Sequence, residues 1–254
     1  METKLVQRFG NGGHIVLPKE YVGRRIRFLT EPKTFEDIKS EIFEILKPHL
    51  EKILGIYLYG SYARNEQTVS SDIDILIVTN EKFKINNKLD NYSIVSVTIK
   101  EIEETLDKNA ILILPIIKAT ETIINPDLLV NYKNYNFTKK NTKLFMDSTV
   151  ETLKLNKKGL ELDFEIGSLV YSLILRIRGL LIIKLLIVKK LFSKMSLFGH
   201  LEKNNIEKEK ISELYIIYCR ERDNIKVKES DIIGKTEIEK LLTIAEKLLK
   251  DIKF

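Results

Sequence analysis

The chain has 254 residues, and its 42 lysines and arginines exceed its 36 aspartates and glutamates to give a formal net charge of +6. Hydrophobic residues make up 44% of it and charged residues 31%, a balance that excludes a disordered chain and indicates a globular one. Cys219 is the only cysteine, which excludes a disulfide within the chain and a cysteine-based zinc site. His14, His49 and His200 are far apart in sequence, which argues against a histidine cluster around a metal.

Positive charge is concentrated at the start of the chain. Residues 1–33 contain seven lysines and arginines against three glutamates, which accounts for most of the net excess. A basic segment of this kind is compatible with nucleic-acid binding. An ordinary solvated basic face explains it equally well.

No stretch of the sequence predicts a secretion signal or a membrane span. The first ten residues lack the apolar core of a signal peptide. The most apolar stretch, 166–188, is interrupted by Arg176, Arg178 and Lys184. We therefore expect a cytoplasmic protein with no membrane partner, in which 166–188 is a buried helix.

Residues 4–29 predict three short strands, at 4–9, 14–18 and 26–29, with a glycine-rich turn between the first two. Pro18 should end the second strand because it cannot donate a hydrogen bond to a strand ladder. The stretch QRFGNGGHIVLPKEYVGRRIRFL resembles the AbrB-like (SpoVT-type) swapped-hairpin segments, in which two copies interlock to bind DNA. The resemblance implies a homodimer and a nucleic-acid partner, and the alternative is a β-rich appendage of the next domain.

The region that follows predicts an α/β domain. Thr34 is a candidate N-cap for a helix whose apolar residues recur at helical spacing, and Pro48 should kink or end that helix. Short apolar runs then predict strands at 55–59, 72–78 and 93–99.

Four residues around the first two of these strands carry the candidate chemistry. Gly60 ends a strand, where its backbone can approach a ligand closely, and Ser61 follows at a helix start, where free N–H groups attract phosphate. Asp72 and Asp74 are two residues apart on the next strand, so their carboxylates share one face. Adjacent carboxylates repel each other unless a cation lies between them, and oxygen ligands favour Mg²⁺ shared with phosphates.

The stretch GSYARNEQTVSSDIDILIV, 60–78, resembles the nucleotidyltransferase superfamily that includes DNA polymerase beta, especially its minimal prokaryotic members. The family pattern is Gly-Ser, a short helix and then Asp-x-Asp on the next strand. The resemblance implies an α+β nucleotidyltransferase fold and Mg²⁺-dependent transfer of a nucleoside monophosphate from an NTP, with ATP as the expected nucleotide. It implies catalysis and metal binding by Asp72 and Asp74, and nucleotide binding by Gly60, Ser61, Arg64 and Ser71. The alternative is that Asp72 caps a turn and Asp74 is a solvated strand residue.

The sequence departs from this family at two positions. Asn65 stands where the family usually has glycine. Active members carry a third carboxylate on the strand that corresponds to 93–99, and this strand contains no acid. Asp90 and Glu101 flank it, but their register is unsuitable. The missing acid favours an alternative function, a catalytically inactive nucleotide-binding or regulatory protein of the antitoxin type that binds DNA through its N-terminal segment.

The last part of the chain predicts a helical bundle, with helices at 139–160, 163–195, 206–222 and 236–252. Its layout resembles HEPN-type bundles, which accompany minimal nucleotidyltransferases. HEPN ribonucleases need an arginine followed closely by a histidine, and neither Arg220 nor Arg222 precedes one, so we expect no ribonuclease activity.

Two arginines inside the most apolar helix need partners, because a buried charge is costly unless it is paired. Arg176 and Arg178 could pair with an acid of the bundle or face the phosphates of a bound nucleotide.

The sequence therefore predicts three parts: a β-rich AbrB-like segment at 1–33, a nucleotidyltransferase domain at 34–136 and a HEPN-like helical bundle at 137–254. The acceptor of the nucleotidyl group is left open among a protein hydroxyl, a small molecule and an RNA end.

Overall fold

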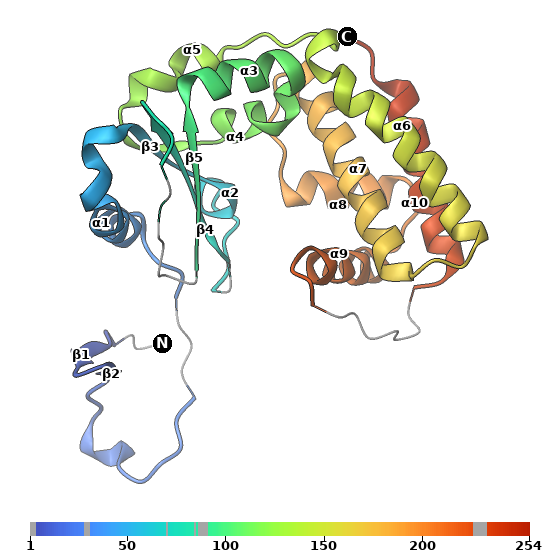
Figure 1. Cartoon of the computed structure of the whole chain (residues 1–254). Coiled ribbons are helices and arrows are strands. Elements are labelled where there is room, and N and C mark those ends of the chain that lie inside the picture. The colour runs from blue at the N-terminus through green and yellow to red at the C-terminus, as the bar shows by residue number, and fades with distance from the viewer. Residues whose placement is uncertain (1–3, 28–30, 70, 84, 86–90, 226–232) are drawn as a thin grey trace. The chain divides into compact units, whose positions relative to one another are not determined.

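The computed structural model describes residues 4–27, 31–69, 71–83, 85, 91–225 and 233–254 (Figure 1). The chain divides into two compact units, Met1–Pro32 and Lys33–Phe254, and each is described by itself. A further boundary near residue 137 stays a prediction.

The smaller unit contains a β-hairpin, β1 (Gln7–Phe9) and β2 (Gly12–His14), followed by a 3-10 helix, η1 (Lys19–Tyr21). The turn contains Gly10 at φ 57°, a left-handed conformation that glycine adopts without steric cost. β2 begins directly after this tight turn, so the predicted strand at 14–18 is wrong, and Pro18 does not end a strand.

The third strand predicted for this unit falls partly outside the described residues. Ile26 and Arg27 form no strand, and residues 28–29 are not among those that the structure describes.

The larger unit is built on a four-stranded sheet in the order β5-β4-β3-β6. The strands are β3 (Ile53–Tyr59), β4 (Ile73–Thr79), β5 (Tyr92–Thr98) and β6 (Glu121–Ile124). β3 pairs antiparallel with β4 and β6, whereas β4 and β5 are parallel. The three predicted strands are confirmed with small shifts at their ends. β6 escaped prediction because it is a short edge strand with half-exposed side chains.

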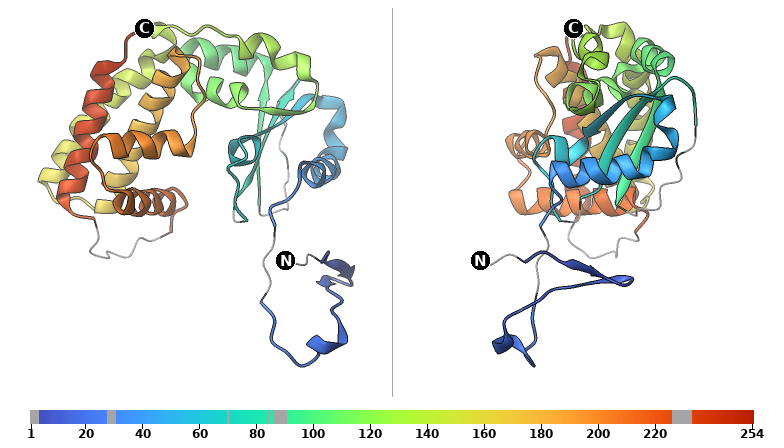
Figure 2. Two further views of the ribbon diagram at one scale, coloured as in Figure 1. Left: turned by 180° about the vertical axis from the view of Figure 1, so that it is seen from behind. Right: turned by 90° about the vertical axis from the view of Figure 1, so that its left-hand side faces the viewer.

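One face of the sheet is covered by α1 (Phe35–Leu46), as the right-hand view of Figure 2 shows. Thr34 is confirmed as its N-cap: the hydroxyl accepts from the backbone N–H of Asp37, and the Asp37 side chain accepts in return. The α-helix ends at Leu46 and continues as a 3-10 helix, η2 (Lys47–Lys52), which contains Pro48.

The opposite face of the sheet is covered by helices from further along the chain. They are α3 (Ile99–Asn109), η3 (Ala110–Leu112), α4 (Leu114–Lys118), η4 (Pro126–Leu129) and α5 (Val130–Lys133). Tyr57, Leu76 and Val78 are buried on this face together with Leu186 from the helical region. A long helix therefore joins the core of the sheet to the bundle.

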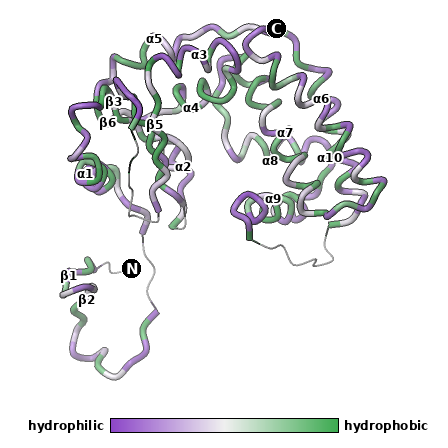
Figure 3. Tube along the Cα trace, viewed as in Figure 1, coloured by the Kyte–Doolittle hydropathy of each residue, from purple (hydrophilic) through white to green (hydrophobic). Residues whose placement is uncertain are grey.

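The helices of the C-terminal region are α6 (Lys139–Glu161), α7 (Ile166–Ile187), α8 (Lys194–Lys203), α9 (Lys208–Arg222) and α10 (Lys235–Asp251). α7 packs against α6, α9 and α10 and is largely buried among them. Hydrophobic and hydrophilic residues alternate along α6 and α10 (Figure 3), as expected for helices with one buried face.

The predicted helix at 163–195 is wrong in its last part, because α7 ends at Ile187. Lys189 has φ 56°, which no α-helix accommodates, and Ser193 then caps α8 through Ser196. In the part of the chain that the structure describes, no helix combines the length and the apolar character that crossing a bilayer requires. The sheet and its helices form the predicted α+β fold, with the predicted helical C-terminal part.

Candidate active site

The pairing of β3 with β4 brings the end of one strand against a carboxylate on the other. Tyr59, the last residue of β3, lies opposite Asp74. Gly60 follows with φ 74° and contacts the Asp74 carboxylate so closely that a Cβ atom at residue 60 would overlap Oδ2. Both the backbone angle and the contact require glycine here.

A short loop winds back from this glycine. It begins with α2 (Gly60–Ala63), in which Tyr62 is buried. The Ser61 carbonyl accepts from the backbone N–H groups of Arg64 (3.2 Å) and Glu66 (2.9 Å). Asn65 has φ 54°, a left-handed angle that asparagine tolerates better than most residues other than glycine, so the departure from the family's glycine is compatible with this backbone.

The two other predicted nucleotide-binding residues make contacts within the loop. The Arg64 guanidinium donates from Nε to Glu66 Oε2 at 2.9 Å. The Ser71 hydroxyl accepts from the backbone N–H of Thr68 at 2.8 Å, which shapes the turn just before Asp72.

Asp72 and Asp74 interact electrostatically. Asp72 is exposed and immediately precedes β4, whereas Asp74 is half-buried on the strand. Burial, and after it the charge of Asp72, raise the pKa of Asp74 to about 6. The structure thus places both predicted metal ligands near each other and close to Gly60. Asp74 lies within β4, and Asp72 directly precedes the first residue of this strand.

A row of three side chains crosses the sheet at this level. Asp74 lies between Tyr59 on β3 and Ser93 on β5, and paired residues in neighbouring strands share a face. Burial and the charge of Asp74 raise the pKa of Tyr59 to about 12, and its hydrogen bond with Ser93 opposes this shift. Ser93 is therefore the residue of β5 that lies beside Asp74.

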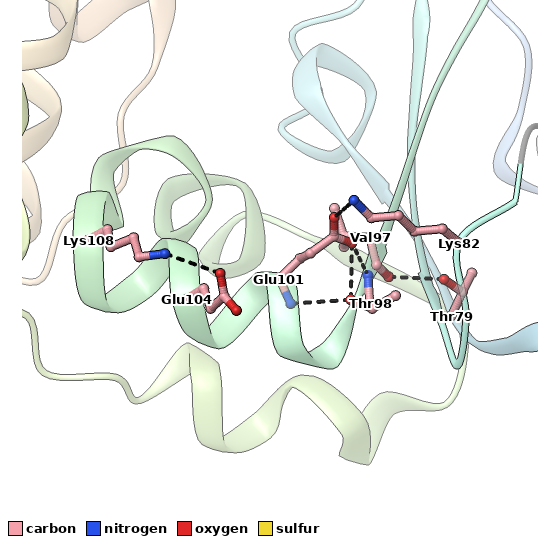
Figure 4. Close-up of polar contacts among 7 residues, drawn as sticks. All are labelled: Thr79, Lys82, Val97, Thr98, Glu101, Glu104 and Lys108. Atoms are coloured by element: carbon pink, nitrogen blue, oxygen red, sulfur yellow. Dashed lines mark hydrogen bonds and ion pairs between the residues drawn. The ribbon is translucent and has the colours of Figure 1, made fainter.

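No acid of the described residues takes the place of the missing third carboxylate. Glu101 lies beyond the far end of β5 from Ser93, where it accepts from the backbone N–H of Thr98 at 2.9 Å and pairs with Lys82 at 2.6 Å (Figure 4). These contacts hold its pKa below the usual range. Asp90 lies outside the described residues.

Two arginines from the helical region also act on Asp74. The charges of Arg64, Arg222 on α9 and Arg178 on α7 oppose the rise in the Asp74 pKa. Sequence reasoning missed Arg222 because nothing local distinguishes it from other exposed helix arginines. It also missed Tyr59, although the position of Tyr59 directly before the glycine that ends the strand could have indicated its place at the site.

The expectation that an acid of the bundle pairs with the arginines of α7 is not met. Arg176 donates to the Ser148 hydroxyl (3.2 Å), and Arg178 donates to the Tyr218 hydroxyl (3.1 Å). Among the residues that the structure describes, neither guanidinium forms an ion pair with a carboxylate.

The donor set suits a hard cation shared with a ligand. Asp72 and Asp74 offer oxygen atoms only, and a cation between them would offset the repulsion that raises the Asp74 pKa. Within the described ranges, no cluster of three or more acids, histidines or cysteines could hold a metal by itself. The remaining ligands of a Mg²⁺ ion would therefore come from phosphate oxygens and water.

Comparison with known families identifies the region that contains this site. Residues 39–154 match the model of the nucleotidyltransferase domain family. The similarity to this family covers a little less than half of the chain. The match contains Gly60, both aspartates and Ser93. The AbrB-like and HEPN-like resemblances find no counterpart among these matches.

Curated relatives come from Methanocaldococcus jannaschii. "Putative protein adenylyltransferase MJ0126" is 48% identical over 61 residues, which are 21% of this chain and 62% of that protein. "Putative protein adenylyltransferase MJ0128" is 52% identical over 44 residues, which are 15% of this chain and 45% of that protein. The chain thus spans about half the length of the curated relatives that it matches.

Two solved structures resemble the chain at low sequence identity. The spectinomycin adenyltransferase AAD(9) from Enterococcus faecialis, solved with ATP and spectinomycin, is 17% identical with a TM-score of 0.45, over 86% of this chain and all of that one. A nucleotidyltransferase-like protein from Exiguobacterium sibiricum is 14% identical with a TM-score of 0.36, over 85% of this chain and 75% of that one.

The raised pKa of Asp74 predicts a stability cost in the ligand-free protein. Its pKa rises from 3.8 to about 6 on folding, so this carboxyl destabilises the folded state above about pH 6, and the cost disappears below about pH 4. We expect Asp74→Asn to increase the free energy of unfolding by up to about 3 kcal/mol near pH 8, and to give no increase near pH 3. Urea denaturation without ligand at both pH values measures this.

The matched control is Asp147→Asn, which changes an exposed aspartate on α6 and should have no effect at either pH. A loss of stability in Asp74→Asn near pH 8 would contradict the description of this carboxylate.

Proposed function

We propose that the protein transfers a nucleoside monophosphate from an NTP, with ATP as the first candidate, to an acceptor hydroxyl in a Mg²⁺-dependent reaction. The observation that carries this proposal is the contact of the Gly60 backbone with the Asp74 carboxylate, beside Asp72. A Cβ atom at residue 60 would overlap the Asp74 carboxylate, so glycine is what allows this carboxylate to lie against the start of the loop proposed to bind phosphate.

Each residue has a role in this proposal. Asp72 and Asp74 hold Mg²⁺, which when bound neutralises phosphate charge and stabilises the attacking and leaving oxygens. The loop that begins at Gly60 and Ser61 lies against the triphosphate. Arg64 adds a positive charge near Asp74, and Ser71 positions Asp72 through its turn.

The proposed acceptor is a protein hydroxyl. This choice rests on the relatives named as protein adenylyltransferases, which match the chain over a limited length. A small-molecule hydroxyl and an RNA end are the other acceptors to be distinguished.

The proposal predicts nucleotide-dependent labelling that requires Asp74. The purified protein is incubated with each of the four NTPs labelled at the α-phosphate, with Mg²⁺ or Mn²⁺, and with a cell extract. We expect labelled acceptor with ATP, and at least about a 100-fold loss with Asp74→Asn, since removing one of two metal ligands weakens metal and nucleotide binding together. Asp147→Asn should label like the wild type.

Nuclease and protease treatment of the product then separates an RNA acceptor from a protein. Absence of label with every NTP and both metals, or equal labelling by Asp74→Asn, would refute the transfer reaction.

The serine in the place of the third acid predicts slow turnover. Ser93 lies next to Asp74, and it has no carboxylate that could accept a proton from the acceptor hydroxyl. We expect Ser93→Asp to raise the transfer rate by about 10²- to 10⁴-fold, the usual contribution of a positioned base. Rates measured under saturating NTP provide the test.

The control is Ser93→Asn, because asparagine has the shape of aspartate without its charge. This variant should not accelerate transfer. A wild-type rate typical of an efficient nucleotidyltransferase, or equal rates for the two variants, would show that Ser93 does not limit the reaction.

We further propose that the N-terminal unit pairs with a second copy of itself. Its apolar side chains are exposed, and those of Leu5, Phe9 and Val22 are 87%, 73% and 81% exposed. A segment of this size cannot bury a core of its own. Pairing would bury these side chains and would combine the basic residues of two copies into a surface that suits nucleic acid.

Light scattering after gel filtration tests this pairing. We expect the chain of 29.5 kDa to elute as a dimer, and the double substitution Phe9→Ser/Val22→Ser to elute as a monomer. Leu144→Ser, which changes a 60% exposed leucine on α6, should remain dimeric. A monomeric wild type, or a dimeric double variant, would contradict the pairing.

A further inference from the structure

One cation near the candidate site, Arg178, forms no ion pair with a carboxylate of the described residues, although its charge acts on Asp74. Arg178 lies half-buried on α7, donates from Nη1 to the Tyr218 hydroxyl at 3.1 Å and stacks with the Phe192 ring at 5.5 Å from its centroid. These contacts hold the guanidinium in place without neutralising it. A half-buried guanidinium without an ion-pair partner is able to bind an anion from outside the protein.

The other two arginines that act on Asp74 already have carboxylate partners. Arg64 pairs with Glu66 at 2.9 Å. Arg222 forms a bidentate pair with Asp223, with bonds of 2.7 and 3.0 Å. Arg178 is thus the arginine of this group with positive charge left over, as judged on the part of the chain that the structure describes.

The position of Arg178 is set by the sheet core. Arg178, Ile182 and Leu186 are spaced by four residues and share one face of α7. Ile182 and Leu186 pack into the cluster that contains Tyr57 and Leu76 of the sheet. This face of α7 is therefore anchored on the same side of the sheet as Asp74, and Arg178 lies about two turns further along it.

Arg176 has the same chemistry on another face of the helix. It also donates to a hydroxyl, that of Ser148, and lies over an aromatic ring, that of Phe145, at 5.4 Å. The arginines are two positions apart in the sequence, which places Arg176 about 160° away from Arg178 around the helix. It is a matched control within the same helix.

We infer that Arg178 binds the β- and γ-phosphates of the NTP from the side of the helical region. This inference rests on the proposed function. The two aspartates and a single Mg²⁺ ion are together neutral, so the charge of the triphosphate must be balanced by cations, and the nearby Arg64 and Arg222 are already paired. A guanidinium suits this role because its planar set of donors matches phosphate oxygens.

Nucleotides with different numbers of phosphates test the inference without any measurement of turnover. Calorimetry with Mg²⁺ compares ATP and AMP binding by the wild type, Arg178→Gln and Arg176→Gln. We expect Arg178→Gln to weaken ATP binding by about 10- to 100-fold, because charged hydrogen bonds are lost, and to change AMP binding less than about 3-fold. Arg176→Gln should bind both nucleotides like the wild type.

Two milder variants, Arg178→Lys and Tyr218→Phe, keep the test possible if Arg178→Gln does not fold. Arg178→Lys keeps the charge but loses the planar fork, and Tyr218→Phe removes the hydroxyl that positions Arg178, so both should weaken ATP binding less than Arg178→Gln does. ATP binding by Arg178→Lys and Arg178→Gln that equals the wild type would overturn the inference.

The outcomes separate this inference from the proposed function. If Asp74→Asn loses ATP while Arg178→Gln and Arg178→Lys keep it, the metal–nucleotide site stands and Arg178 does not bind phosphate. If Arg178→Gln weakens the binding of ATP and of AMP equally, the arginine does not bind the β- and γ-phosphates. If the wild type binds no NTP, the proposed function itself fails.

Discussion

The contact of the Gly60 backbone with the Asp74 carboxylate is the constraint on which the site depends. It follows from the antiparallel register that sets Tyr59 opposite Asp74 and from the left-handed turn that only glycine accepts without strain at this contact. The same register places Ser93 on the other side of Asp74. A strand slip of one residue would turn Asp74 to the other face of the sheet and dismantle the whole arrangement.

Stability and binding act in opposite directions at this carboxylate. Burial and a like-charged neighbour make Asp74 unfavourable in the ligand-free protein, and a cation would remove that cost. The apolar clusters compensate for it: α1 covers one sheet face, and α7 enters the cluster on the other through Leu186. Because α7 belongs to both the sheet core and the bundle, it fixes Arg178 relative to the aspartates.

Local signals in the sequence predicted the elements around the site and missed what distant segments add. Apolar runs and the Thr34 cap indicated the strands and the first helix, and Gly-Ser with Asp-x-Asp indicated the site. The charges of Arg178 and Arg222 act on Asp74 because of how the helices pack, which no local pattern encodes. The break between α7 and α8 was missed because apolar residues continue through it, while a left-handed lysine and a serine cap decide it. In the hairpin of β1 and β2, the tight turn at Gly10 determines which residues pair. The second strand therefore begins at Gly12, before the apolar run that predicted a strand at 14–18.

The position of a bound metal tests the central claim most directly. Crystals of the protein grown with Mn²⁺ and a non-hydrolysable ATP analogue would reveal the ion by its anomalous scattering. The account predicts an anomalous peak bound by both Asp72 and Asp74, with the analogue's phosphates against the backbone of Gly60 and Ser61. A bound analogue with no peak at the aspartates, or with its phosphates away from Gly60, would contradict it.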